Sequence, residues 1–181
     1  MFKAEMHHNR DTVHSFTKTQ FNVFEKKTKL IMFAVSLALL AAGALKLVGE
    51  TVSLILVLLG CLVFDDVGSV PKRTADRMLK AGSKFEAVSY IFEDSHIEVL
   101  QSGKRGRVEY DSFIRIVKDR SYAYLFMNRM QVHMLELSSL EPNDAEAFFS
   151  FIESKTGLSW SGADSLMRLD IKALIKKLSR R

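Results

Sequence analysis

An apolar stretch from Leu30 to Phe64 constrains this chain more than any other feature. It consists of two blocks, residues 30–48 and 51–64, separated by a short polar break. As a helix rising about 1.5 Å per residue, the uncharged run from Leu30 to Leu45 covers roughly 24 Å, and it approaches the ~30 Å hydrocarbon core once the Lys46 side chain reaches the head groups. The second block covers roughly 21 Å and needs local thinning of the bilayer. We therefore expect a two-helix transmembrane hairpin.

The distribution of charge favours two crossings over one. Basic residues flank both outer ends of the hairpin: Lys26, Lys27 and Lys29 before it, and Lys72, Arg73, Arg77 and Lys80 after it. Only Lys46 and Glu50 lie at the turn. Because basic residues near span ends favour the cytoplasmic side, two crossings keep both clusters inside, whereas a single crossing exports one. We expect a multi-pass protein of the cell (plasma or inner) membrane, with both termini cytoplasmic.

Two other interpretations of the apolar stretch are weaker. It could form buried helices of a large soluble core, but the rest of the chain is too small to enclose such a pair. Ala42-Gly43-Ala44 resembles a signal-peptide cleavage site, yet a long polar region precedes it and a second apolar block follows at once.

Small residues within the hairpin predict how its helices pack. Ala34, Ala38 and Ala42 recur every four residues and form a ridge that Ser53 and Gly60 of the second helix could face. Small side chains allow helix backbones to approach closely in a membrane. Packing inside one chain is the first interpretation and homodimerisation the alternative, so the oligomeric state stays open.

Composition excludes several classes of site. Cys61 is the single cysteine, which rules out a disulfide framework or a cysteine-based zinc site. The net charge of +5 is uneven: residues 1–29 carry six basic and three acidic side chains, residues 65–159 thirteen and fifteen, and residues 160–181 six and two. Positive charge beside the apolar stretch and in the tail suits anionic lipid head groups better than nucleic acid.

The region after the hairpin is predicted to be a strand-rich domain. Alternating and β-branched segments indicate strands at 85–92, 96–101, 107–110, 113–118, 122–127 and 130–137, with a hairpin loop at 102–106. A helix from about Asp144 to Lys155, capped by Asn143 and closed by Gly157, presents an aromatic face to cover the strands. This is an α+β plan.

The remaining segments complete five predicted regions. The N-terminal arm, residues 1–29, contains a short strand at 1–7 and a helix that Asn9 caps and that runs toward the first span. A basic linker, residues 65–83, joins the hairpin to the domain at 84–157, and residues 158–181 form a tail. From Asp164 onward, apolar residues at helical spacing alternate with bases, which predicts a basic amphipathic helix lying on the membrane or on its own domain.

The strand segments resemble a known family. VSYIFEDSHIEVL at 88–100 and VEYDSFIRIVKDRSYAYLFMNRMQVHMLEL at 108–137, after two spans and before a capping helix, resemble the bacterial YcxB-like family. The resemblance covers about residues 85–155 and implies a pleckstrin-homology-like domain on the cytoplasmic face, with no settled activity. One departure is Leu137-Ser138-Ser139-Leu140, where relatives carry a Pro-Lys-like step.

No pattern of catalytic or metal-binding residues emerges. His7 and His8 adjoin and would point to opposite faces of a strand, and no carboxylate has ligand-like spacing. Asp65 and Asp66, at the end of the second block, could mark an ion path but fit solvation at head-group level better. Neither a nucleophile elbow nor a phosphate loop is present. We expect no enzyme, no cofactor and no metal.

Binding is the remaining class of function. The first hypothesis is a membrane-anchored binding or scaffold protein that presents its domain to a protein or peptide partner. The alternative is a module that responds to anionic lipid, because basic side chains of an inter-strand loop and of the tail helix can contact phosphate. The candidate head-group ligands are Lys104, Arg105, Arg107, Lys172, Lys176 and Lys177. Nucleic acid is not expected, since the domain is slightly acidic.

Overall fold

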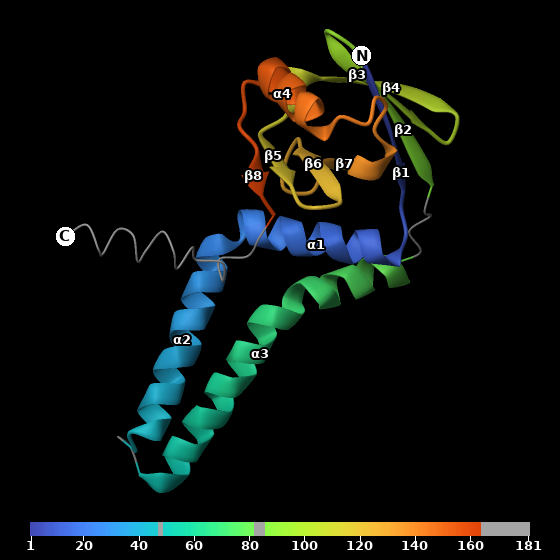
Figure 1. Cartoon of the computed structure of the whole chain (residues 1–181). Coiled ribbons are helices and arrows are strands. Elements are labelled where there is room, and N and C mark those ends of the chain that lie inside the picture. Colours follow the sequence, from blue (N-terminus) through green and yellow to red (C-terminus); the bar gives the residue numbers. More distant parts are fainter. Residues whose placement is uncertain (47–48, 82–85, 164–181) are drawn as a thin grey trace, which may run out of the picture. The chain divides into compact units, whose positions relative to one another are not determined.

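The computed structural model describes residues 1–46, 49–81 and 86–163 and divides the chain into two compact units. The strand-rich unit comprises residues 1–16 and 86–163, and the hairpin unit comprises residues 17–46 and 49–81. Helices, antiparallel sheets and a C-terminal helix follow one another along the chain, which confirms the predicted α+β class (Figure 1). The tail from residue 164 lies outside the described residues.

Two four-stranded sheets form the strand-rich unit. The first has the order β1-β2-β3-β4 and is antiparallel throughout, with β1 at Phe2–His7, β2 at Ala87–Phe92, β3 at His96–Gln101 and β4 at Lys104–Glu109. The second has the order β7-β6-β5-β8, with β5 at Arg115–Lys118, β6 at Tyr122–Phe126, β7 at Val132–Glu136 and β8 at Ser161–Gly162. β8 is parallel to β5 and the other pairs are antiparallel.

The first strand belongs to the same sheet as strands that follow the hairpin. β1 pairs with β2 over six residues, from Phe2 opposite Phe92 to His7 opposite Ala87. Its inward side chains, Phe2, Ala4 and Met6, are 8%, 1% and 0% exposed. The expected strand is therefore present, but it is part of the domain core. The predicted division into an arm at 1–29 and a domain at 84–157 differs from the structure, in which residues 17–82 interrupt one domain.

A short 3₁₀ helix, η2 at Leu137–Ser139, fastens the outer side of β1. The Ser139 hydroxyl donates to the Glu5 carbonyl at 2.7 Å and accepts from the Glu5 N–H at 2.9 Å. Next to it, Lys3 and Glu141 exchange two backbone hydrogen bonds of 2.8 and 2.9 Å. The segment that departs from the family pattern thus holds β1 in place.

The helix α4, Ala145–Thr156, covers the core as predicted. Its N-cap is Asp144, whose side chain accepts from the Ala147 N–H at 2.9 Å, so the cap lies one residue after the predicted Asn143. Gly157 ends the helix with φ of 68°, a conformation that glycine adopts without strain. The Phe148 ring lies 5.0 Å from Phe92 and 5.4 Å from Phe2, in edge-to-face geometry. One aromatic cluster therefore joins α4, β1 and β2.

The hairpin unit begins within α1, Arg10–Phe24. Asn9 caps this helix as expected: its side chain accepts from the Thr12 N–H at 2.9 Å, and the Thr12 hydroxyl accepts from the Asn9 N–H at 2.8 Å. The helix does not run on into the apolar stretch, because Glu25 interrupts it before α2 begins at Lys26 and continues to Ala44.

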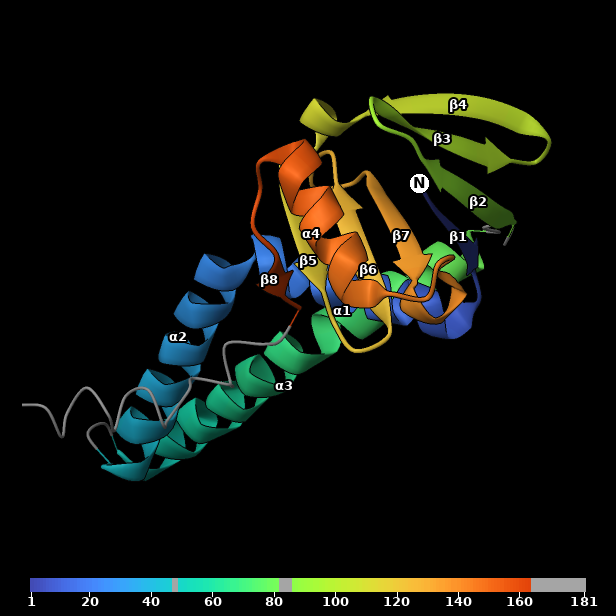
Figure 2. The ribbon, with the colours of Figure 1, turned by 45° about the horizontal axis from the view of Figure 1, so that its top comes forward.

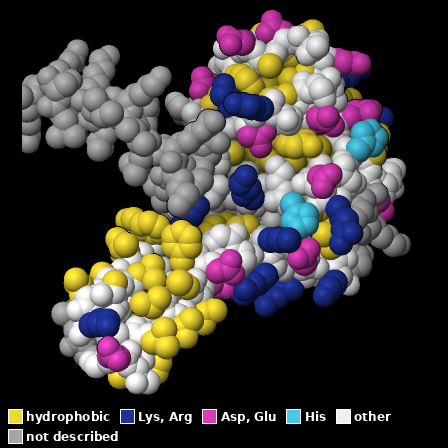
Figure 3. Space-filling model, turned by 60° about the horizontal axis from the view of Figure 1, so that its bottom comes forward, with side chains coloured by type: hydrophobic (Ala, Val, Ile, Leu, Met, Phe, Trp, Pro, Cys, Tyr) yellow, Lys and Arg dark blue, Asp and Glu magenta, His cyan; other side chains and the backbone are white. Residues whose placement is uncertain are grey.

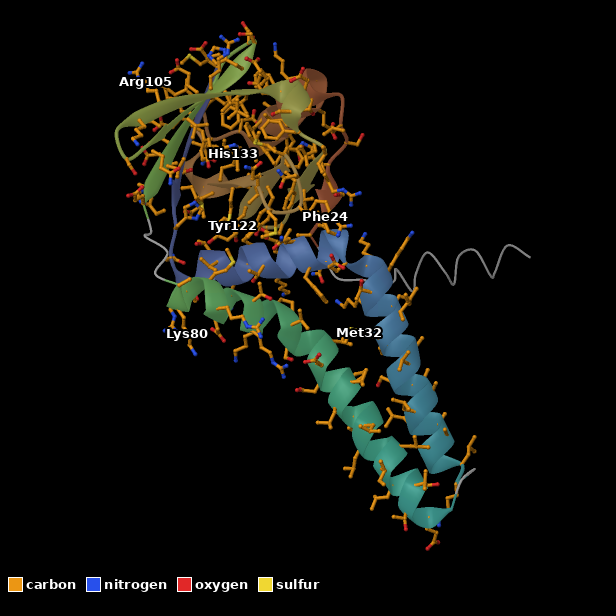
Figure 4. All side chains as sticks on the ribbon, turned by 180° about the vertical axis from the view of Figure 1, so that it is seen from behind. Phe24, Met32, Lys80, Arg105, Tyr122 and His133 are labelled. Atoms are coloured by element: carbon orange, nitrogen blue, oxygen red, sulfur yellow. The ribbon has the colours of Figure 1, made fainter. Side chains whose placement is uncertain are left out.

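The helix α3 runs without interruption from Glu50 to Lys80. It includes most of the predicted linker, and at about 1.5 Å per residue its 31 residues measure roughly 46 Å. Pro71 lies inside it and lacks the N–H that would bond to the preceding turn, which permits the bend along α3 in Figure 4. Both α2 and α3 are long and apolar enough to cross a membrane. Figure 3 shows hydrophobic side chains gathered over the apolar part of this unit.

Candidate functional site

The three predicted head-group ligands that the structure describes, Lys104, Arg105 and Arg107, all lie on β4 and are exposed. The loop predicted at 102–106 is shorter than expected. Only Ser102 and Gly103 form the turn, with φ of 53° and 74°. Two successive positive φ values are typical of a two-residue hairpin turn, so the following bases enter the strand directly. The bases thus lie along a strand and not at a loop tip.

Alternation along β4 separates these side chains between two faces. Lys104 lies on one face with Gly106 and Val108, and Arg105 lies on the opposite face with Arg107. Arg107 Nε lies 2.7 Å from Glu109 Oε1, and both side chains are at least half exposed. An exposed pair of this kind contributes ~0.2–1 kcal/mol to stability. The side chains of Lys104 and Arg105 make no hydrogen bond or ion pair with any described residue. Figure 4 labels Arg105 at the outer margin of the unit.

A hollow of about 440 Å³ adjoins the inner face of β4. Its lining consists of Val99, Gln101, Ser102, Lys104, Arg105, Gly106, Val108 and His133. The imidazole ring of His133, on β7, packs edge-to-face against the rings of Tyr90 and Phe113, with distances between ring centroids of 5.8 and 6.2 Å. Burial lowers the pKa of His133, because desolvation disfavours the imidazolium. At neutral pH the hollow therefore has a neutral, largely apolar floor beside free positive charge.

A second, wider hollow of about 830 Å³ lies where α1, β5, α4 and β8 meet. Its polar groups already bind one another: Asp119 accepts from the Ser121 and Tyr122 N–H groups and from the Tyr124 hydroxyl at 2.9 Å. Lys118 Nζ lies 3.6 Å from the centre of the Phe149 ring. These interactions order the β5–β6 turn, and we assign them a structural role.

Metal-ligating side chains do not cluster in the described ranges. Within residues 1–46, 49–81 and 86–163, no three His, Cys, Asp or Glu side chains gather as metal ligands. In the same ranges, every buried side-chain nitrogen or oxygen has a hydrogen-bond partner. The tail bases Lys172, Lys176 and Lys177 lie outside the described residues.

The hairpin helices pack through small residues, though not through the predicted alanine ridge. Ala34 and Ala38 are exposed and Ala42 is half-buried, whereas Ser36 and Gly43 are the buried residues of α2. Ser36 and Gly43 are seven residues apart, so they lie on one face of α2. This face differs from the one that carries the predicted alanine ridge.

On α3, Ser53 and Gly60 are buried, as the predicted packing requires. The Ser36 hydroxyl donates to the Gly60 carbonyl at 2.8 Å. A Cβ added at Gly43 would lie 2.7 Å from the Ser53 carbonyl oxygen, and one added at Gly60 would lie 2.8 Å from Leu40 Cγ. Close approach of the two backbones therefore requires glycine at both positions.

The two carboxylates at the end of the apolar block differ in their surroundings. Asp66 accepts from Arg73 Nη1 at 2.6 Å, along the same helix, and Asp65 is exposed. The signal for this pairing was present in the sequence, since a spacing of seven residues returns a helix to nearly the same face.

Comparisons with known proteins identify the central part of the strand-rich unit. Residues 92–152, from the last residue of β2 into α4, match the model of the family described as YcxB-like protein. Neither the curated proteins nor the solved structures contain a match. The match covers most of the segment in which the resemblance was seen, and two helices with the length and composition of membrane spans precede it. Residues 92–152 of this chain are therefore a YcxB-like region, as the resemblance predicted.

Proposed function

We propose that this protein is a non-enzymatic, membrane-anchored binding or scaffold protein. In this proposal the α2–α3 hairpin crosses the cell membrane twice, and the strand-rich unit is a pleckstrin-homology-like domain that faces the cytoplasm and a protein or peptide partner. Two packed sheets closed by a C-terminal helix support the comparison with that fold.

One observation carries the topology: β1 precedes the hairpin, β2 follows it, and the two strands are paired over six residues. Strands that share hydrogen bonds lie on the same side of a membrane. An even number of crossings between His7 and Ala87 satisfies this condition, and a single crossing violates it. Cleavage after Ala44 would also remove Phe2 and Met6 from the core, which argues against a cleaved signal peptide.

The charges at the ends of the helices favour the cytoplasmic orientation. Bases in the first turn of α2 and along the last part of α3 would flank the cytoplasmic surface, while the turn carries the exposed Lys46–Glu50 ion pair, with an N–O distance of 3.2 Å. Because these two charges are paired, moving the turn across the membrane costs less free energy than moving an unpaired charge.

Cysteine accessibility tests the topology. Cys61 is the single cysteine, so Cys61→Ala gives a background for Glu50→Cys in the turn and for Ser102→Cys in the domain. A membrane-impermeant maleimide is expected to label position 50 in intact cells and position 102 only after permeabilisation. Labelling of both sites, or only of the domain, in intact cells would contradict the proposed orientation.

Crosslinking tests the binding role. Photoreactive amino acids placed along β4 and along the exposed face of α4, in full-length chain expressed in its own cells, are expected to capture a discrete protein neighbour. The same label at Leu54, which is 62% exposed on α3, serves as the membrane-facing control. Capture of lipid alone from every position would favour the lipid-responsive alternative.

A further inference from the structure

The outer edge of β4 is the open edge of the first sheet. At the opposite side, β1 is fastened by Ser139 and Glu141, and in the second sheet β8 covers part of the edge of β5. No described residue pairs with β4 on its outer side. Figure 2 shows β4 along the outer margin of its sheet. An unpaired strand edge offers a row of backbone donors and acceptors to another extended chain.

The register determines which residues offer these groups. The two-residue turn pairs Gln101 with Lys104, and such closing pairs are hydrogen-bonded. Since hydrogen-bonded and non-hydrogen-bonded pairs alternate, the N–H and C=O groups of Arg105 and Arg107 point outward, away from β3. The backbone groups of Glu109 also point outward, but its carbonyl already accepts a hydrogen bond from the Ser112 hydroxyl at 2.6 Å. Arg105 and Arg107 therefore present up to four free backbone groups.

Charge on this edge distinguishes between occupants. An antiparallel pair of two β4 strands centred on Arg107 would place the two Arg107 side chains opposite each other, which is destabilising, and Arg105 of each copy opposite Glu109 of the other. A partner strand with carboxylates opposite both arginines avoids the first of these contacts. Arg107 is already paired with Glu109, so Arg105 is the base that most favours an acidic partner.

The hollow beside β4 adds a second requirement. Side chains directly opposite one another in a sheet point to the same face, so a partner residue opposite Gly106 or Val108 would point to the side of the 440 Å³ hollow. The floor there contains Val99 and the half-buried His133. Gly106 carries no side chain that would fill this space.

We propose that β4 binds an extended segment of a partner protein that alternates acidic and apolar residues and adds to the sheet as a further strand. The acidic residues contact Arg105 and Arg107, and an apolar residue enters the hollow beside Gly106. This inference rests on the proposed binding role and names the chemical class of its partner.

Binding of a synthetic peptide tests the inference. The probe is a fluorescent seven-residue peptide of alternating Glu and Val, and the protein is the full chain in nanodiscs of phosphatidylcholine. Fluorescence anisotropy is expected to show saturable binding. A peptide of the same composition with Glu and Val in separate blocks, and one N-methylated on alternate amides, are expected to bind at least tenfold more weakly.

Two variants of one residue separate backbone pairing from charge. Arg105→Pro removes an outward N–H without removing a bond to β3, and loss of such a bond is expected to weaken binding by about tenfold. Arg105→Ala keeps the N–H and loses only an exposed charge, so we expect it to weaken peptide binding by about threefold. Lys80→Ala in α3 is the matched control and should bind as the unsubstituted chain does. Near-ultraviolet circular dichroism checks that each variant is folded.

The inference is overturned if the alternating peptide does not bind, or if the block peptide binds equally well. It is also overturned if Arg105→Pro and Arg107→Pro, both folded, bind like the unsubstituted chain. A further arm uses phosphatidylglycerol vesicles: association that Arg105→Pro and Arg105→Ala reduce equally would assign the bases to lipid. Failure of the peptide while crosslinking captures a protein elsewhere on the domain would reject this edge and leave the proposed function intact.

Discussion

The two units of this protein are stabilised in opposite ways. In the hairpin unit, α2 and α3 follow each other directly and contact through a narrow stripe of small residues, while large apolar side chains such as Leu37 and Leu62 are 59% and 67% exposed. In the strand-rich unit, the largest side chains are buried, and Phe2 pairs with Phe92 across the entire hairpin. The hairpin is local in sequence and leaves large apolar side chains exposed, whereas the domain is non-local and buries them in its own core.

This difference has a consequence for how the domain assembles. Contacts between distant residues carry a larger cost of loop closure than contacts between neighbours. Contact between α2 and α3 shortens the free chain that separates β1 from β2, which lowers that cost once the hairpin has formed.

Deletion of residues 1–7 is the strongest test of the non-local unit. Loss of Phe2 and Met6 from the core costs on the order of 5–10 kcal/mol, which is comparable to the whole stability of a typical domain, about 5–15 kcal/mol. We expect the deletion to abolish the near-ultraviolet circular dichroism of the domain and its resistance to protease, while α2 and α3 stay helical in detergent.

The matched control removes the hairpin and keeps β1. Residues 1–16 are joined to residues 86–163 by a Gly/Ser linker of about ten residues, long enough to return from α1 to β2. This chain is expected to fold without detergent. If the chain that lacks residues 1–7 keeps a protease-resistant domain, the pairing of β1 is not essential and the contrast between the units fails.

Gly43→Ala tests the contact stripe of the hairpin unit. The added Cβ would lie 2.6 Å from Val57 Cγ2 and 2.7 Å from the Ser53 carbonyl oxygen, so the helices must separate. Overpacking of this kind costs about 1–3 kcal/mol. We expect a longer distance between spin labels on α2 and α3, and a lower unfolding temperature in detergent.

Gly68→Ala is the control on α3, because a Cβ there meets nothing within 4 Å. Alanine inside a helix is favoured over glycine by about 0.5–1 kcal/mol, so the control should stabilise the helix slightly. Equal behaviour of the two variants would show that the stripe does not hold the hairpin together.

The pH dependence of unfolding tests the burial of His133 in the strand-rich unit. Its pKa in the folded state is lowered by desolvation, so the unfolded chain binds more protons at pH values between the folded pKa and the ordinary value of 6.5. Stability is therefore full above pH 6.5 and falls as the pH decreases through that window, by at most about 1.4 kcal/mol per pH unit for one group.

His133→Gln should flatten this part of the pH profile in urea unfolding. It should not remove the whole dependence, because burial also lowers the pKa of His8. A profile that does not change on substitution would mean that His133 is solvated in the folded protein.

The sequence predicted the local features well and the non-local ones poorly. Apolar periodicity located α2, the strands from β2 to β7 and the helix α4, because each pattern lies within one element. It could not assign β1 to the sheet, since nothing in residues 1–7 specifies a partner that lies beyond the hairpin. The alternation of apolar and polar residues predicted a strand there, but its pairing with β2 is seen only in the structure.

The candidate site shows the same limit at smaller scale. The bases of β4 were recognised, but their division between two faces depends on the turn at Ser102 and Gly103 having two residues. In the hairpin, the stripe through Ala34 and the stripe through Ser36 both contain small residues, and the sequence does not decide between them. The hydroxyl of Ser36 and the missing side chain of Gly43 distinguish the second stripe, and a spacing of seven residues was the available signal.

Ser36→Ala should have the smallest effect and sharpens the comparison most. The hydroxyl is buried and donates to the Gly60 carbonyl at 2.8 Å, so its loss removes one interhelical hydrogen bond. The carbonyl still accepts the N–H of the next helical turn, and alanine leaves no polar group without a partner. Hydrogen bonds between apolar helices contribute on average about 0.6 kcal/mol. We therefore expect a small decrease in unfolding temperature and no change in the distance between spin labels. A loss as large as that of Gly43→Ala would mean that hydrogen bonding, and not close backbone packing, holds the hairpin together.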